Sequence, residues 1–92
     1  MKTVHKYVLN PHGEPRTIEI TEDHAFIYTS FMTNAKELWV WVEVDTDPGA
    51  KREVKTLKVT RSGDALPTEA EYCGTAVDQY HAEAYHVYCL AN

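Results

Sequence analysis

Apolar and polar residues alternate along much of this chain with the two-residue period of β-strands. The clearest case is the segment Leu38–Val44, whose even-numbered residues are all aliphatic and whose odd-numbered residues are Trp39, Trp41 and Glu43. Because successive side chains of a strand point to opposite faces, the aliphatic residues share one face and both tryptophans share the other. The pattern therefore predicts a central strand that is covered on both faces.

The segment before this one has the same character. Ala25–Met32 is rich in β-branched and aromatic residues, and the short polar stretch Asn34–Glu37 separates it from Leu38–Val44. Two such runs joined by a few polar residues are typical of a β-hairpin. We therefore expect these two strands to pair antiparallel.

Five further segments have the length and residue types of short strands and are separated by residues typical of turns. They are Thr3–Leu9, Arg16–Ile20, Arg52–Arg61, Tyr72–Val77 and Ala84–Leu90. We also expect a single helical turn at Thr68–Glu71. About seven short strands in 92 residues predict one all-β domain, residues 1–92, built as a small antiparallel sandwich or a partly closed barrel.

The composition is that of an ordinary globular protein, with 43% hydrophobic and 25% charged residues. The formal net charge of -5 argues against general nucleic-acid binding, so no direct sequence-specific contact with nucleic acid is expected. No segment approaches the roughly 20 apolar residues of a membrane span, and no signal-peptide pattern follows Met1. Two cysteines, Cys73 and Cys89, are too few for a disulfide scaffold, and we expect both to be reduced in a cytoplasmic protein.

The aromatic residues are the first candidates for a binding surface. Trp39 and Trp41 share one strand face, and Tyr85 and Tyr88 lie in the last predicted strand. Exposed, these residues would form a typical binding or oligomer surface; buried, the tryptophans would fill the core of a sandwich. Both interpretations remain open from the sequence. Because the chain is short and its core small, we expect a homodimer or a higher oligomer.

A basic strand is the second candidate. Residues 51–61 contain five of the nine lysines and arginines of this acidic chain, and Arg52, Lys55, Lys58 and Arg61 are the residues proposed to bind an anion or a phosphate. Nearby aromatic rings would then stack on a nucleotide base. The alternative is a solubilising edge strand, in which lysines prevent pairing with another sheet.

No set of residues assigns catalysis or a metal. Cys73, His81, His86 and Cys89 are the residue types that hold zinc, but their spacing differs from the paired spacing of zinc motifs. Neither cysteine lies in a basic setting that would activate it as a nucleophile. We therefore assign no catalytic, cofactor or metal residue and expect a protein that is not an enzyme.

Several short motifs occur along the chain in an order that resembles a known family. They are Lys2-Thr3-Val4-x-Lys6-Tyr7, Thr17-Ile18-Glu19, Leu38-Trp39 with Asp45, Leu57-Lys58-Val59 with the loop Ser62–Pro67, Tyr72-Cys73-Gly74-Thr75, and Tyr85-His86-Val87-Tyr88. Their order and spacing resemble small proteins of bacteriophages and prophages that are known only as a domain of unknown function. The chain departs from that pattern in the Pro-rich loop Asn10–Pro15 and in the stretch Gln79–His81.

The resemblance implies a phage gene product that acts in the cytoplasm of an infected bacterial host, and it brings no catalytic residues. Small acidic phage proteins without enzymatic motifs are often accessory proteins that disable host defences. The expected function is therefore to counter a bacterial immune system by binding, either by occluding a host defence protein or by sequestering a nucleotide second messenger. The alternative is a structural or assembly protein of the phage particle.

Overall fold

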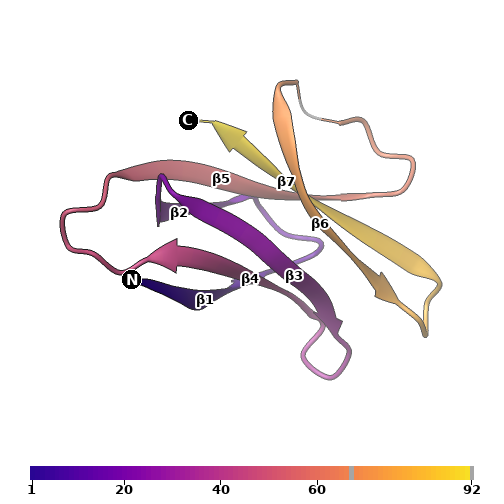
Figure 1. Ribbon diagram of the computed structural model, residues 1–92. Helices are drawn as coiled ribbons and strands as arrows, with labels where there is room; N and C mark the ends of the chain where they lie inside the picture. The colour runs from indigo at the N-terminus through magenta and orange to yellow at the C-terminus, as the bar shows by residue number, and fades with distance from the viewer. Residues whose placement is uncertain (67, 92) are drawn as a thin grey trace.

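The fold consists of two antiparallel β-sheets packed face to face, as the computed structural model in Figure 1 shows. The structure describes residues 1–66 and 68–91. Its strands are β1 (Lys2–Leu9), β2 (Arg16–Thr21), β3 (His24–Met32), β4 (Glu37–Asp45), β5 (Arg52–Arg61), β6 (Ala70–Asp78) and β7 (Glu83–Ala91). These strands confirm the prediction of a small all-β sandwich. Within the described residues there is no closed barrel and no helix that could span a membrane.

Each sheet combines strands from separate parts of the chain. The three-stranded sheet, sheet A, has the order β1-β4-β3, and the four-stranded sheet, sheet B, has the order β2-β5-β7-β6. β3 and β4 form the expected hairpin, in which Phe31 pairs with Leu38 and Thr29 with Val40. Because β1 pairs with the other edge of β4, the Leu38–Val44 segment is the central strand of sheet A.

The core lies between the two sheets and follows from the alternation in the sequence. In β4 the even-numbered residues, from Leu38 to Val44, are buried, and the odd-numbered residues between them are only partly buried. Sheet B contributes buried residues from all four of its strands, among them Ile20, Leu57 and Val87. Burial of each such side chain stabilises the fold by about 1.5–3 kcal/mol relative to exposure. Because aliphatic residues occupy every second position of β4, they all lie on the face of sheet A that packs against sheet B.

Two β-bulges shape the edges where the sheets meet. The register shifts between Phe26 and Tyr28 in β3, and between Tyr72 and Gly74 in β6. Edge strands β3 and β6 pack against each other across the sandwich, and they lie side by side in Figure 1. Gly74 lies so close to Thr29 that a Cβ at this position would overlap the Thr29 hydroxyl oxygen. The absence of a side chain at residue 74 therefore permits this contact between the sheets.

One predicted element is wrong. Thr68 and Glu69 form a turn, not a helical turn, and β6 already begins at Ala70. Glu69 has a φ of 57°, which is a left-handed backbone conformation. A residue in this conformation cannot be part of a right-handed helical turn. All seven predicted strands are present; Arg52–Arg61 agrees at both ends, and the ends of the others differ by at most two residues.

Candidate binding surface

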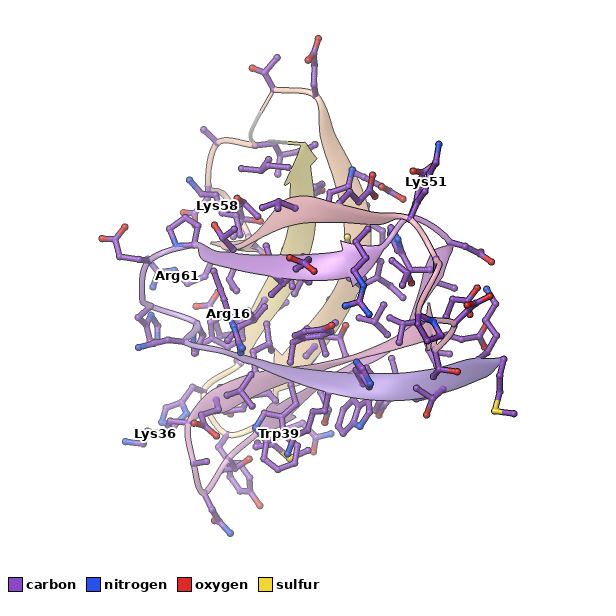
Figure 2. The ribbon with its side chains drawn as sticks, turned by 90° about the vertical axis from the view of Figure 1, so that its left-hand side faces the viewer. Arg16, Lys36, Trp39, Lys51, Lys58 and Arg61 are labelled. Carbon is purple, nitrogen blue, oxygen red and sulfur yellow. The ribbon has the colours of Figure 1, made fainter. Side chains whose placement is uncertain are left out.

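The outer face of sheet A, turned away from the core, is the first candidate binding surface. The residues that make up this surface, which we call the aromatic face, are Val4, Lys6, Val8, Tyr28, Trp39 and Trp41. Figure 2 shows Trp39 on the side of sheet A that is turned away from sheet B. The aromatic face thus consists of odd-numbered residues of β4 and of the residues that lie beside them in β1 and β3.

Three rings form a row across this face. Tyr28 and Trp41 lie 5.7 Å apart between ring centroids, and Trp41 and Trp39 lie 6.0 Å apart. Trp39 is held from two sides, because its Nε1 donates a hydrogen bond of 3.1 Å to Glu37 Oε1 and Lys6 Nζ lies 3.6 Å above its ring. A cation over an indole ring is attracted by the electrons of its face. Glu37 and Lys6 therefore hold the indole of Trp39 in one orientation.

Much of the aromatic face is exposed. The exposed fraction is 64% for Tyr28 and 47% for Val4, and both tryptophans are partly buried and outside the core. Large apolar side chains gathered on one face of a small protein are typical of a surface that contacts another molecule. The structure thus places Trp39 and Trp41 on a surface.

The structure does not bring the other two predicted aromatic residues to this face. Tyr85 is buried between the sheets, where its ring stacks on Phe31 at 5.3 Å. Tyr88 lies on the outer face of sheet B, 5.7 Å from the ring of Tyr72. The four aromatics therefore belong to three separate environments.

The four predicted basic residues do not converge either. Register with β7 places Lys55 and Arg61 on the face of β5 that also carries Leu57, and Arg52 and Lys58 on the other face. Two of the four have acidic partners: Arg52 Nη1 lies 3.6 Å from Glu19 Oε1, and Lys55 Nζ lies 3.6 Å from Glu53 Oε1.

Figure 2 also shows Lys58 and Arg61 at one end of the sandwich and Lys51 at the other. A phosphate site needs several cations or N–H groups around one point, and the described residues of β5 do not form such a cluster.

The cysteines and histidines named in the sequence are also separated. Cys73 and Cys89 are buried free thiols on the inner side of sheet B, and burial raises the pKa of each. His81 lies in the β6–β7 turn, and His86 lies on the outer face of sheet B. In the part of the chain that the structure describes, no three His, Cys, Asp or Glu side chains are placed to hold a metal. Thiols with raised pKa values are poor nucleophiles.

The ring of His86 is part of a short series of hydrogen bonds with neighbouring hydroxyl groups. The hydroxyl of Tyr72 bonds that of Thr75, Thr75 Oγ1 lies 3.0 Å from His86 Nδ1, and His86 Nε2 lies 3.3 Å from Ser62 Oγ. A serine–histidine pair in an enzyme needs a carboxylate to stabilise the imidazolium that forms. Here the neutral hydroxyl of Thr75 lies where the carboxylate would be. The hydrogen bonds therefore orient the His86 ring but do not stabilise a positive charge on it.

Sequence reasoning missed a pocket at one end of the sandwich. It has a volume of about 370 Å³, and its lining includes Lys36 of the β3–β4 turn and His81 of the β6–β7 turn. Phe31 and Tyr85 form its apolar wall, and Asp78 and Glu83 supply carboxylates. The available sequence signal was the pair of acidic residues that flank the turn Gln79–Ala82, because a hairpin places such residues opposite each other.

The chain is thus a small β-sandwich with a non-core aromatic surface and a separate end pocket. Its whole length, residues 1–92, matches the family described as Domain of unknown function (DUF7352), and the chain belongs to that family. This membership confirms the expectation of a family of unknown function. No curated protein and no solved structure matches the chain.

Proposed function

We propose that this chain is a non-enzymatic binding protein that covers part of the surface of a partner protein with its aromatic face. In the phage setting that the resemblance implies, the partner is a protein of a bacterial defence system. The observation that carries the proposal is the row formed by Tyr28, Trp41 and Trp39 on the outer face of sheet A. Tryptophan and tyrosine are the residues that most often dominate the affinity of protein interfaces.

The geometry of Trp39 supports this function. Binding costs conformational entropy when side chains must become ordered, and a side chain already held in place loses less. The hydrogen bond to Glu37 and the contact with Lys6 hold the indole of Trp39 before binding. A row of exposed rings with one indole already held in place is suited to a protein surface with an apolar patch.

Charge indicates the kind of partner. The chain has a formal net charge of -5, and carboxylates of Glu37 and Glu43 flank the tryptophans on β4. Complementary charge speeds association and disfavours wrong partners. The expected partner therefore presents an apolar patch with a basic rim.

Nucleotide sequestration receives less support. That mechanism needs cations and rings around one ligand, whereas Arg52 and Lys55 bind carboxylates of this chain and lie on opposite faces of β5. The aromatic face belongs to the other sheet. Occlusion of a protein is the mechanism that the arrangement favours.

Photo-crosslinking in bacterial cells tests the proposal. A benzophenone amino acid replaces either Tyr28 on the aromatic face or Tyr72 on the outer face of sheet B; these two tyrosines are similarly exposed, at 64% and 57%. We expect a discrete adduct with another protein from position 28 only, and its loss when Trp41→Ala is added. Equal adducts from both positions, or an adduct with the mass of two copies of this chain, would contradict the proposal.

Affinity for the crosslinked partner provides the quantitative test. Removal of a central aromatic residue from an interface costs at least about 2 kcal/mol, so Trp41→Ala should weaken binding by more than about tenfold. Tyr72→Ala is the matched control and should leave affinity unchanged. Both tryptophans of the chain lie on this face, so intrinsic fluorescence reports its coverage directly.

A further inference from the structure

The end pocket has the features of a site for an organic cation. It lies on the inner side of sheet A, opposite the aromatic face, and the inference does not depend on the proposed function. Its wall is made by the stacked rings of Phe31 and Tyr85, with His12 packed edge-on against Tyr85 at 5.9 Å. Faces of aromatic rings attract cations and also contact apolar chains.

Two carboxylates face each other at this pocket. Asp78 of β6 pairs directly with Glu83 of β7, and both line the cavity. Like charges directly opposite each other on adjacent strands destabilise a sheet. Asp78 accepts hydrogen bonds from the Tyr80 N–H and from His81, whereas Glu83 has no ion-pair or hydrogen-bond partner among residues 1–66 and 68–91. A bound cation would relieve this repulsion.

The hydroxyl of Tyr85 is a second feature that points to a ligand. Tyr85 is only 4% exposed and lines the pocket, yet its hydroxyl has no hydrogen-bond partner within the described part of the chain. Burial, together with the charges of Glu83 and Asp78, raises the pKa of Tyr85, so the hydroxyl stays protonated. Among the described residues no buried side-chain oxygen or nitrogen lacks a hydrogen-bond partner, so the Tyr85 hydroxyl oxygen reaches solvent through the pocket. It is therefore available to a polar group of a ligand that enters the pocket.

The cations near the pocket do not fill it. Lys36 belongs to the lining, but its side chain projects away from the body of the protein in Figure 2. Arg61 pairs with Tyr85 across β5 and β7 and is exposed, outside the lining. His81 Nδ1 donates a hydrogen bond of 2.7 Å to Asp78 Oδ2, and both residues belong to the lining of the pocket. The space between Glu83 and the rings is left for another group.

We propose that this pocket binds a guanidinium or ammonium group carried on a short apolar chain. The charged head would lie between Glu83 and the Tyr85 hydroxyl, and the chain would lie along Phe31 and Tyr85. Two sources have this chemistry, a basic side chain of a protein and a free alkyl amine or guanidine. A volume of about 370 Å³ is at the lower end of the range for small-ligand sites.

NMR titration of the ¹⁵N-labelled chain with n-butylguanidinium tests the proposal. We expect saturable shifts of the amides of Asp78, Glu83 and Tyr85, and at least tenfold weaker binding of neutral n-butylurea, which has nearly the same shape. A capped Gly-Arg-Gly peptide, with its citrulline analogue as control, then assigns the source. Binding of the peptide indicates a protein side chain, and binding of n-butylguanidinium alone indicates a small molecule.

Variants locate the site. Glu83→Gln should weaken n-butylguanidinium binding by roughly tenfold, since a hydrogen bond to a charged group is lost, and Tyr85→Phe by several-fold. Glu71→Gln, which removes an exposed carboxylate elsewhere on β6, is the matched control and should have no effect. Equal binding of the urea, or unchanged affinity in Glu83→Gln with native thermal stability, would overturn the proposal.

Discussion

The close approach of Gly74 to Thr29 leaves no room for a single added methyl group. In Gly74→Ala the new Cβ would overlap Thr29 Oγ1 and lie 3.2 Å from Thr29 Cβ. Thr29 is buried, so its side chain cannot move into solvent without opening the contact between β3 and β6. Overpacking of this kind typically costs 1–3 kcal/mol. We expect the free energy of unfolding to fall by about that amount.

Urea denaturation and thermal unfolding measure this loss. For a domain of this size, each kcal/mol shifts the melting temperature by about 4–8 °C, so a decrease of roughly 5–20 °C is expected. Gly49→Ala is the control for an added methyl group alone, because a Cβ there would meet only Asp47 Oδ1, at an ordinary 3.5 Å, and Gly49 lacks the positive φ, 156°, of Gly74. That substitution should leave the melting temperature nearly unchanged.

A double variant separates crowding at Thr29 from a general effect of alanine in β6. Thr29→Ala removes the hydroxyl that the new methyl group would meet, so its cost should not add to that of Gly74→Ala. The double variant should therefore be more stable than the sum of the two single losses predicts. Simple additivity, or a Gly74→Ala chain as stable as the unmodified protein, would refute the role assigned to this contact.

Two further predictions follow from titratable groups. Because burial raises the pKa of Cys73 and of Cys89, iodoacetamide at pH 8 should label both far more slowly in the native protein than in urea; labelling at the rate of a free thiol would contradict their burial. Burial raises the pKa of Asp78, but the bonds from His81 and from the Tyr80 N–H outweigh it, and the pKa lies below its usual value of 3.8. The ionised carboxylate therefore stabilises the fold above that pH and loses its effect as pH falls. Asp78→Asn should lower the free energy of unfolding more at pH 6 than at pH 3, and equal losses at both would count against this explanation.

Much of the fold could be predicted from local alternation. In β4 every second residue is aliphatic over the whole strand, so one period-two pattern assigned the strand and placed both tryptophans on one face, but it left open which face is turned to the core. The β3–β4 hairpin follows from the polar residues between two such runs. These features depend on neighbours in the chain, which are visible in a sequence.

Features that depend on distant parts of the chain could not be predicted in the same way. Alternation gives each residue a face but does not say which sheet a strand joins, so Tyr85 could not be separated from Trp41. The bulge beside Ile27 shifts the faces of β3 partway along the strand. The end pocket depends on Phe31 of one sheet meeting Tyr85 of the other, and no local pattern contains that contact.

The interleaved order of the strands has a consequence for how the chain folds. Sheet A is complete once residues up to Asp45 are available, but β2, which lies between β1 and β3 in the chain, pairs only with β5 of sheet B. Sandwiches dominated by such non-local pairings fold in milliseconds to seconds, far more slowly than helical bundles. During synthesis, a completed sheet A would present the aliphatic face of β4 without its cover until β5, β6 and β7 follow. Slow folding and transient exposure of that face would make the nascent chain prone to aggregation.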